Sequence, residues 1–375
     1  MSSKCNVIQI VPLRPNRPDG IGDYGTSLAQ AMLQRAEVNS IFVSGTPAGM
    51  EQVRPDGWQT IAVPRRTGRA LTELLSQLCR SGDVAAVIVH VSGYGYQKRG
   101  VPFWLLEGIR GWRQMHGRCR LLGIFHELFA TGRVWNSSFW LSKAQEYTTR
   151  AIWNACDGGI TTTAPYYRQL ALWRPNAERL LRTMPVFSNV GEPMSVPAPD
   201  DRSPRLAVFG RAGTGQNVYE KPFHCMSELI VKMLDVSEVI DMGTRTSKPP
   251  ERLGRAPIRV LGQLPPELVS EQLRSCRYGL LNYDVARLEK SGVFAAYAVH
   301  GVIPVCIGSE AGPPLGLEEG KHFMRWPLSR AADLRSMQEK LMEWYHGHSI
   351  ARHADVVGSW CLAGANGARA SAHAG

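Results

Sequence analysis

Short apolar runs alternate along the first half of the chain with longer stretches in which apolar residues recur at helical spacing. Apolar runs that end abruptly in polar or glycine-rich residues are typical of buried parallel strands, and the longer stretches predict connecting helices. We predict strands at 6–11, 39–43, 84–91, 120–125 and within 157–163, and helices at 26–35, 68–81, 101–116, 141–156 and from 164. This alternation predicts a doubly wound α/β domain.

The second half repeats the pattern after a stretch rich in Pro, Ser and acidic residues, PVFSNVGEPMSVPAPDDRSP, which favours no regular element. Strands are predicted at 206–209, 238–242, 259–262, 278–282 and 302–307, and helices at 221–234, 266–276, 293–300 and 331–345. We therefore predict an N-terminal domain at 1–187, a linker at 188–204, a second domain at 205–345 and a C-terminal segment at 346–375. The Gly/Ala/Ser-rich tail from about residue 364 is expected to be disordered.

The segment LEKSGVFAAYAVHGVIPVCI, residues 288–307, joins a small polar turn to a buried helix and strand. Gly301 suits the position just past the helix end, where a left-handed backbone is common. The turn Lys290-Ser291-Gly292 places a lysine beside the helix start. Backbone N–H groups and the helix dipole favour an anion such as phosphate there. An ordinary buried αβ unit is the alternative interpretation.

A glycine-rich segment, Gly20-Ile21-Gly22-Asp23-Tyr24-Gly25, follows the first strand and matches G-x-G-x-x-G. A dinucleotide site requires these glycines directly after the strand and an acid after the second strand. Here a long loop intervenes, and the second strand ends in Ser44-Gly45. We therefore interpret the segment as a loop that lets a ligand approach the backbone at a helix start, with Thr26 or Ser27 as the helix cap.

Polar and aromatic groups follow the predicted strands of the first half. His126 and Glu127 come directly after strand 120–125, where residues face the ligand crevice of an α/β domain. The alternative for His126 is a structural histidine with satisfied hydrogen bonds. The loop after strand 84–91 holds Tyr94 and Tyr96, and Trp135 lies in an aromatic segment at 130–140. We expect these three aromatic residues to bind an acceptor, and simple packing is the alternative for Trp135.

Composition narrows the possible partners. The 375 residues include 43 Lys+Arg and 32 Asp+Glu, a net charge of +11, which favours acidic small molecules, an anionic membrane surface or nucleic acid. The basic residues are scattered, so we expect no nucleic-acid partner. None of the eight cysteines forms a C-x-x-C pair, which fits a reducing cytoplasm. No signal sequence or membrane-spanning run is visible, and peripheral contact with the inner face of a membrane stays open.

Five segments resemble glycosyltransferases of the GT-B fold, particularly the family 4-like group of the family 1/4 superfamily. RPDGIGDYGTSLAQAM resembles their N-terminal loop and helix, FHELFATG their histidine-bearing strand end, and CDGGITTTAPYYRQL the segment before their linker. VFGR and LEKSGVFAAYAVHGVIPV are similar to their two donor-binding segments. The resemblance implies two Rossmann-like domains facing across a cleft. It implies transfer from a nucleotide sugar to a saccharide or lipid-linked acceptor in polysaccharide or glycan biosynthesis.

The resemblance also implies roles for individual residues. The catalytic candidates are His126, Glu127 and Asp23. The donor-binding candidates are Gly22, Arg211, Lys221, Glu289, Lys290, Ser291 and Gly292. No cofactor and no metal are expected, because cations and a helix start can stabilise the departing diphosphate. The resemblance implies a retaining reaction.

The chain departs from that group at two places. The second of two spaced glutamates is replaced by Ala296, with Glu289 as a displaced version of the first, and the interval from Arg211 to Lys221 is longer than usual. A divergent enzyme is our preferred interpretation. A non-catalytic nucleotide-sugar or glycan-machinery binding module and a Rossmann oxidoreductase are the alternatives.

Overall fold

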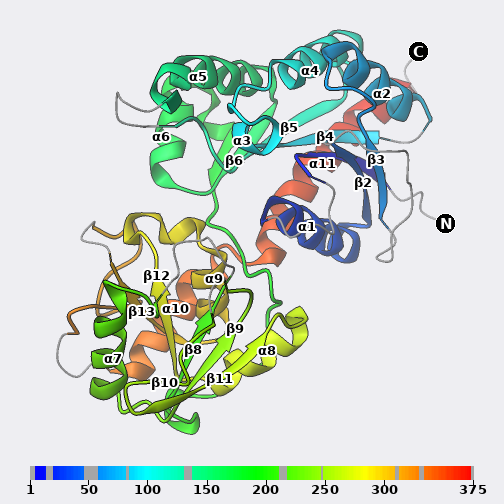
Figure 1. The fold of residues 1–375 in the computed structure, drawn as a ribbon. Helices are drawn as coiled ribbons and strands as arrows, with labels where there is room; N and C mark the ends of the chain where they lie inside the picture. The colour runs from blue at the N-terminus through cyan, green and yellow to red at the C-terminus, as the bar shows by residue number, and fades with distance from the viewer. Residues whose placement is uncertain are drawn as a thin grey trace. The chain divides into compact units, whose positions relative to one another are not determined.

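The chain forms two compact units in the computed structural model, shown in Figure 1. Unit 1 combines Met1–Met184 with Ile350–Gly375, and unit 2 is Pro185–Ser349. The structure describes the backbone of residues 5–13, 20–45, 58–81, 84–130, 137–210, 218–245, 248–308, 312–328 and 333–372, and the side chains of these residues except 137–140, 178 and 364–372.

Unit 1 contains a parallel sheet in the order β3-β2-β1-β4-β5-β6-β7. Its strands are β1 (Cys5–Val11), β2 (Val38–Ser44), β3 (Gln59–Ala62), β4 (Val84–Val91), β5 (Arg120–Phe125), β6 (Gly158–Thr161) and β7 (Leu181–Thr183). The central strands are nearly continuous apolar runs because both of their faces are covered. The strand order reverses between β1 and β4, where doubly wound folds place their ligand crevice.

The helices of unit 1 cover both faces of this sheet (Figure 1). They are α1 (Gly20–Ala36), α2 (Gly68–Ser81), α3 (Gly93–Tyr96), α4 (Phe103–Met115), α5 (Ser137–Ala155), α6 (Ala164–Trp173) and α11 (Ile350–Ala372), with a 3₁₀ turn η1 (Pro175–Leu180). Helices α2, α4 and α5 lie on one side and bury a core with Ile8, Ile10 and Val89. Helices α1 and α11 lie on the other side.

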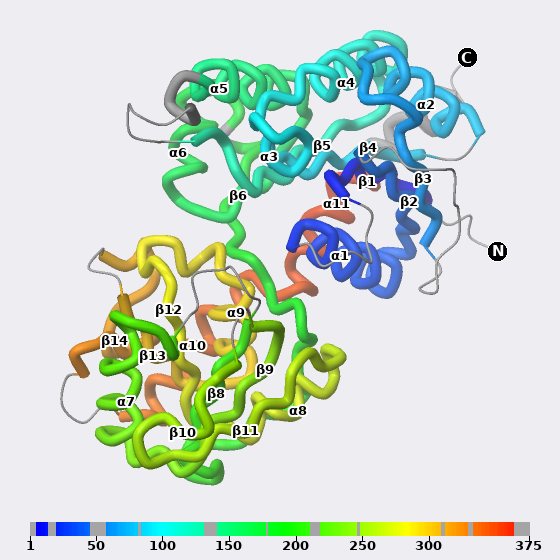
Figure 2. Tube along the Cα trace, in the orientation of Figure 1, coloured from blue at the N-terminus to red at the C-terminus, as the bar shows by residue number. Residues whose placement is uncertain are grey.

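The C-terminal helix α11 returns to unit 1 and lies beside α1, as the red and blue segments of Figure 2 show. A bidentate pair joins Arg35 on α1 to Asp355 on α11, with both nitrogen–oxygen distances below 3.0 Å. The composition of the tail predicts disorder from about residue 364, whereas the backbone continues as helix to Ala372. Alanine has the highest intrinsic helix propensity, so an alanine-rich segment can extend a helix that packing has already started.

Unit 2 contains the second sheet, in the order β10-β11-β9-β8-β12-β13-β14, parallel except for the β10–β11 pair. Its strands are β8 (Arg205–Phe209), β9 (Glu238–Met242), β10 (Arg252–Leu253), β11 (Ala256–Gly262), β12 (Tyr278–Asn282), β13 (Ile303–Ile307) and β14 (Met324–Arg325). Its helices are α7 (Phe223–Met233), α8 (Pro266–Ser275), α9 (Gly292–Val299) and α10 (Leu334–His346), with 3₁₀ turns η2 (Pro199–Asp201) and η3 (Val285–Lys290).

The predicted fold class is confirmed, because each unit is a Rossmann-like doubly wound α/β domain. Strands 84–91, 120–125, 238–242 and 278–282 have the predicted bounds. The strands missed by the pattern, β3, β7, β10 and β14, have only two to four residues each. Runs this short carry too little periodicity to be separated from loops.

The irregular segment predicted as a linker packs against unit 2 through specific hydrogen bonds. The Ser188 backbone N–H donates to the Tyr345 hydroxyl at 2.9 Å, and that hydroxyl donates to the Glu192 carboxylate at 2.6 Å. The guanidinium of Arg202 donates to the Cys276 and His300 carbonyls at 3.0 and 2.8 Å. These bonds pair the Ser188 N–H and the Cys276 and His300 carbonyls with side chains. Side-chain hydrogen bonds therefore hold the segment in place where it forms no long helix or strand.

Candidate functional site

The loops that leave β4 and β5 in unit 1 are held together at the carboxyl edge of the sheet. The backbone N–H groups of His126 and Glu127 both donate to the Val91 carbonyl, at 3.0 and 3.2 Å. The Ser92 hydroxyl donates to the Glu127 carboxylate at 2.8 Å. The His126 side chain is 9% exposed, whereas that of Glu127 is exposed. Two predicted catalytic residues are thus fixed at the edge where parallel α/β sheets bind ligands.

A buried polar chain crosses four neighbouring strands and ends at His126. His90 Nδ1 lies 3.1 Å from His126 Nε2, and the two rings are nearly parallel, at 9°. His90 Nε2 lies 2.9 Å from Gln9 Oε1. The Gln9 amide nitrogen donates to Ser40 Oγ at 2.9 Å. We call Ser40, Gln9, His90 and His126 the polar chain; its members come from β2, β1, β4 and the end of β5, in the order of the sheet.

Burial fixes the protonation of the middle of this chain. Gln9 and His90 are fully buried, and burial lowers the pKa of His90 to about 3. His90 is therefore neutral at ordinary pH. A neutral imidazole carries one N–H and one lone pair, so His90 bridges its two neighbours as one donor and one acceptor.

Tyr24 on α1 packs in edge-to-face contact with both histidines of the polar chain. Its ring centroid lies 5.0 Å from that of His126 and 5.9 Å from that of His90. The Tyr24 hydroxyl is 2.7 Å from Nδ1 of His353 on α11, and burial raises the pKa of this hydroxyl well above its ordinary value. The C-terminal helix thus contributes a buried side chain next to the polar chain.

The glycine-rich segment was predicted as a loop before a helix at 26–35, and this is wrong. Helix α1 already begins at Gly20, and the Thr26 hydroxyl donates to the Gly22 carbonyl within the helix, so it does not cap the helix start. Gly25 faces the sheet, where an added Cβ would meet Phe42, Gln9 and His90 at 3.4 to 3.6 Å. The glycine brings α1 close to the polar chain. Gly22 is buried and Asp23 half-buried in the first helical turn, where an acid is stabilised by the helix dipole.

The predicted acceptor-binding aromatics occupy different environments. Tyr96 is 1% exposed and donates its hydroxyl to the Ile10 carbonyl at 2.9 Å, so its side chain is part of the core of unit 1. Tyr96 packs into the core because the short helix α3 turns its side chain back over β1. Tyr94 is 45% exposed and accepts a hydrogen bond from Gln145 at 3.0 Å. Trp135 lies outside the described residues.

In unit 2 the turn Lys290-Ser291-Gly292 forms the start of helix α9. The Ser291 hydroxyl accepts a hydrogen bond from the Phe294 N–H at 3.1 Å and caps the helix. From Phe294 to its end α9 is buried, and only Gly292 and Val293 in its first turn are partly exposed. The backbone N–H groups that solvent or a ligand can reach in α9 are therefore those of its positive end.

The other described donor-binding candidates of unit 2 lie around the carboxyl edge of its sheet. Lys290 is half-buried beside the α9 start, and Lys221 is exposed just before α7. The Glu289 side chain is 4% exposed, and its carbonyl accepts from the Val186 N–H at 2.9 Å. Arg211 lies outside the described residues. The structure thus brings Glu289, Lys290, Ser291 and Gly292 together at one helix start.

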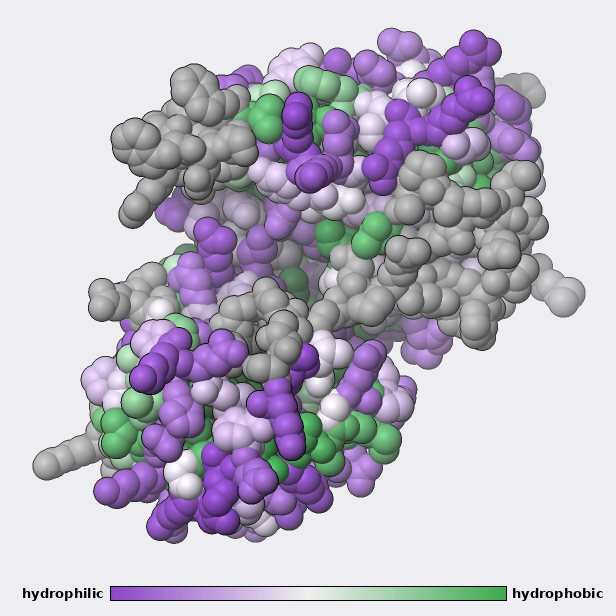
Figure 3. Space-filling view, viewed as in Figure 1, coloured by the Kyte–Doolittle hydropathy of each residue, from purple (hydrophilic) through white to green (hydrophobic). Residues whose placement is uncertain are grey.

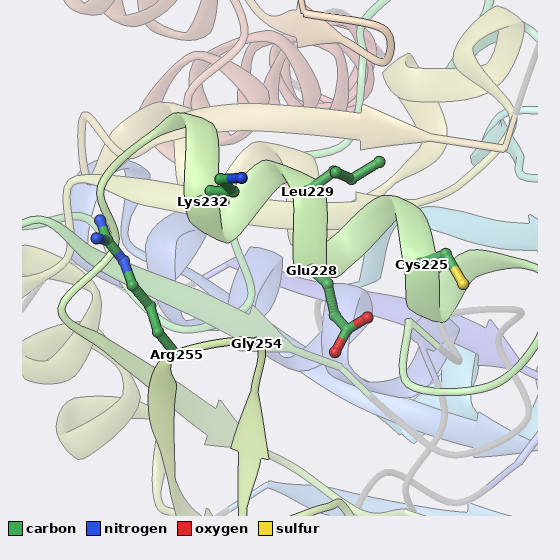
Figure 4. A pocket seen from close by; sticks show the side chains of 6 residues that line it. All are labelled: Cys225, Glu228, Leu229, Lys232, Gly254 and Arg255. Carbon is green, nitrogen blue, oxygen red and sulfur yellow. The ribbon is translucent and has the colours of Figure 1, made fainter.

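A surface hollow of about 530 Å³ lies at the opposite edge of the same sheet (Figure 4). It is lined by Cys225, Glu228, Leu229, Lys232, Gly254 and Arg255. Gly254 and Arg255 form the turn before β11, so the hollow borders the amino ends of the strands. Ligands of parallel α/β sheets bind beyond the carboxyl ends, and the hollow is therefore separate from the candidate donor site.

The described part of the chain offers neither a metal-binding cluster nor a membrane-spanning helix. No group of three or more His, Cys, Asp or Glu side chains there is arranged to hold a metal ion. No described helix combines the length and apolar character needed to cross a membrane. On the face seen in Figure 3, apolar residues are scattered among hydrophilic ones. The predicted independence of metal and the predicted membrane contact stay predictions.

Four side chains near the candidate site were missed as site residues. They are Gln9, Tyr24, His90 and His353. Gln9 and His90 are single polar residues within the apolar runs VIQIV and VAAVIVHV, and a buried polar residue in a strand needs a partner. That signal could have identified both. Nothing local distinguishes Tyr24 or His353.

Neither a family model nor a curated protein sequence matches this chain. Solved structures do match along nearly its whole length. A trehalose-6-phosphate synthase, OtsA, covers 95% of this chain and 99% of its own, with a TM-score of 0.60 and 9% identity. Anabaena Alr3699/HepE in complex with UDP-glucose covers 98% and 99%, with a TM-score of 0.51 and 11% identity.

A putative UDP-N-acetylglucosamine 2-epimerase from Listeria monocytogenes covers 95% of both chains, with a TM-score of 0.51 and 14% identity. At these identities the likeness concerns the arrangement of elements. The chain therefore has the GT-B fold predicted from its sequence, with two Rossmann-like domains, the fold that these solved sugar-processing proteins share.

Proposed function

We propose that this protein is a glycosyltransferase that moves a sugar from a nucleotide-sugar donor to a saccharide or lipid-linked acceptor. The observation that carries the proposal is the start of α9, where the partly exposed residues Gly292 and Val293 of a buried helix follow Lys290 and the Ser291 cap. A neighbour of the same fold is described in complex with UDP-glucose. The anion site proposed at this helix start suits the diphosphate of such a donor.

In this proposal unit 2 binds the donor. The leaving group of the reaction is a nucleoside diphosphate, whose negative charge grows as the sugar–phosphate bond breaks. N–H groups of the α9 first turn, aided by Lys290, Lys221 and Arg211, stabilise that charge more strongly in the transition state than in the ground state. In this proposal these donors supply the positive charge, so no metal ion is needed. We also propose that the transferred sugar retains its anomeric configuration.

Unit 1 binds the acceptor and the transferred sugar in this proposal. His126 at the end of β5 is within a rigid frame, because its backbone and its ring are both hydrogen-bonded. A positioned imidazole can accept a hydrogen bond from a sugar hydroxyl or shuttle a proton. Glu127, held by Ser92, and Tyr94 supply further polar groups at the same edge.

Substitution of Gly292 tests whether one backbone N–H group of the proposed donor site binds the nucleotide. Gly292→Pro removes that N–H, while proline is well accepted at the first helical position and Ser291 already has the extended backbone that precedes proline (φ −87°, ψ 107°). Loss of one hydrogen bond to a charged group costs about 1.5–3 kcal/mol, so the Kd for UDP and for UDP-sugars should rise roughly 10- to 100-fold. Calorimetric titration measures this change.

Gly292→Ala is the matched control, since it keeps the N–H. Its added Cβ would lie 3.8 Å from the nearest side chain, Asn189, and binding should be unchanged. If UDP, GDP, ADP and TDP and their sugars all fail to bind the wild-type chain, the proposed donor site is wrong. Binding without transfer to any saccharide or lipid-linked acceptor, with Gly292→Pro weakening it, favours the non-catalytic binding module.

A further inference from the structure

Two cysteines of unit 1, Cys79 and Cys119, have side chains that are hydrogen-bonded to each other. Cys79 lies in the last turn of α2, and Cys119 directly precedes β5. Both are free thiols and both are partly exposed. The Cys119 thiol also lies 3.8 Å from the carbonyl of Val84, the first residue of β4. The pair is therefore at the surface of unit 1, at the amino edge of its sheet.

The contacts of the two thiols differ in kind, and they favour a thiolate at Cys79. The Trp112 indole N–H donates to Cys79 Sγ at 3.4 Å. The Val84 carbonyl can only accept, so Cys119 is the thiol that donates. Hydrogen bonds from Cys119 and from Trp112 lower the pKa of Cys79 to about 7, against the opposing effect of burial, and the positive charge of Arg80 acts in the same direction.

Cys119 keeps its proton. Its hydrogen bond with Cys79 and its burial both raise the pKa of the Cys119 thiol. Arg113 and Asp157 are the charged groups near it, and they act on this pKa in opposite directions because they form an ion pair with each other. The pair thus combines a readily ionised sulfur with a thiol in contact with it, which is the arrangement of redox-sensitive cysteines.

We propose that Cys79 and Cys119 form a site of reversible thiol oxidation, at which a hydroperoxide such as hydrogen peroxide converts the pair to a disulfide. In the first step the Cys79 thiolate attacks one peroxide oxygen, the O–O bond breaks, hydroxide leaves, and Cys79 becomes a sulfenic acid. In the second step the Cys119 sulfur attacks the Cys79 sulfur. The sulfenic oxygen then leaves as water with the Cys119 proton. Two thiols lose two electrons in total, and the peroxide is reduced to water.

The positions of the two residues suit bond formation and its reversal. The sulfurs must approach to about 2.05 Å, and neither residue is in the middle of an element that resists this movement. A small-molecule thiol can reduce a disulfide at the surface by exchange. Burial, in contrast, raises the pKa of four other cysteines and makes them poor nucleophiles. These are Cys156, Cys276, Cys306 and Cys361.

The oxidation site is separate from the candidate sites described above. Cys119 precedes β5 and His126 follows it, so the whole length of this strand separates the two. The residues of the α9 start belong to unit 2, whereas both cysteines belong to unit 1. The inference therefore goes beyond the proposed transfer reaction, and its test needs no nucleotide sugar.

Peptide mapping of the full chain after oxidation tests the proposal. Reduced protein is treated with stoichiometric hydrogen peroxide, remaining thiols are blocked with N-ethylmaleimide, and the peptides are analysed by mass spectrometry without reductant. Peptides joined through Cys79 and Cys119 should appear and should be lost after dithiothreitol. Cys225→Ser is the matched control, because it removes an exposed thiol of unit 2 and should leave the link unchanged. Absence of the link, whichever other cysteine is oxidised, would overturn the proposal.

Single variants test the order of the two steps. In Cys119→Ser the sulfenic acid on Cys79 has no thiol partner, so dimedone should label Cys79 after peroxide treatment. In Cys79→Ser, Cys119 should remain unlabelled under the same conditions. Labelling of Cys119 in Cys79→Ser as strong as that of Cys79 in Cys119→Ser would refute the assignment of Cys79 as the residue that reacts first.

The pH dependence of alkylation tests the contacts that activate Cys79. Its reaction with iodoacetamide should have a midpoint near pH 7. Cys119→Ala removes a hydrogen-bond donor and should move this midpoint towards the ordinary value of about 8.5. Cys119→Ser keeps a hydroxyl donor and should move it less. A wild-type midpoint at or above about 8.5 would mean that Cys79 is not activated and would refute the proposal, even if Cys119→Ala does not fold.

Discussion

His90 in unit 1 and His300 in unit 2 are both fully buried, and the two are bonded in different ways. In unit 2, Nδ1 of His300 donates to the Ala296 carbonyl and Nε2 accepts from the Ser270 hydroxyl, both at 2.7 Å. Both nitrogens are used within α8, α9 and the turn that follows, as in an ordinary structural histidine. In unit 1, His90 bonds to a second histidine, His126, at the sheet edge. Burial alone therefore does not distinguish His90 from His300, but the residues to which each is hydrogen-bonded do.

The two candidate sites, one in each unit, differ in the same sense. In unit 1 the candidate groups are side chains whose orientation depends on other side chains across four strands. In unit 2 the main donors are backbone N–H groups at the start of α9, and only the Ser291 cap is a fixed side chain. In unit 1, single substitutions should therefore lower activity by removing a hydrogen-bond partner of a candidate side chain. In unit 2, donor binding should weaken mainly when a backbone N–H group or a cationic side chain is lost.

The largest expected effect is at the end of the polar chain. His126→Ala should lower the turnover of a detected transfer reaction by about 10²-fold or more, the range for loss of a positioned acid–base group. The donor Kd should change much less. Ser270→Ala is the matched control in unit 2, because it removes the hydroxyl partner of His300. Steady-state kinetics measures the turnover of each variant, and calorimetric titration measures its donor Kd. An equal loss of turnover in His126→Ala and Ser270→Ala would mean that His126 has no special role in the reaction.

Acid should destabilise both units through these histidines. Burial lowers the pKa of His90 to about 3 and that of His300 to about 4, whereas the unfolded value is near 6.5. The unfolded chain then binds more protons below pH 6.5, so stability falls as the pH drops through this window. From pH 6.5 to 4.5 the loss attributable to His90 is at most about 2.7 kcal/mol.

Urea unfolding at several pH values measures this slope, and His90→Gln should reduce it for the transition of unit 1. A slope that is the same in His90→Gln and in the wild type would mean that His90 is protonated in the folded state.

The smallest expected effect concerns Gly25, which the sequence analysis placed in a ligand-approach loop. Its nearest neighbours would meet an added Cβ at 3.4 to 3.6 Å, ordinary contacts, and alanine is favoured over glycine inside a helix by about 1 kcal/mol. Gly25→Ala should leave UDP-sugar binding unchanged and alter unit 1 stability by about 1 kcal/mol or less. Thermal unfolding and titration check this, and a large loss of binding would restore the ligand-approach interpretation.

Several features were readable from the chain because they are local. Strands 84–91 and 278–282 are continuous apolar runs bounded by polar residues, so their ends are sharp. Gly301 was expected beyond a helix end, and its φ is +61°. The glycine-rich segment failed because its spacing fits both a loop and the close packing of a helix on a sheet. Tyr96 failed because an aromatic residue in a loop can turn into the core.

The sequence by itself determined two doubly wound halves, the loops that leave their strands, and a polar helix start in the second half, because each depends on residues close together in the chain. Only the tertiary structure decided that Gln9, His90 and His126 form one line of hydrogen bonds, since they lie on strands that become neighbours only in the sheet. It also decided that His353, 329 residues from Tyr24, returns to unit 1. Contacts between segments that are distant in the chain depend on tertiary packing, and the local pattern of apolar and polar residues does not predict them.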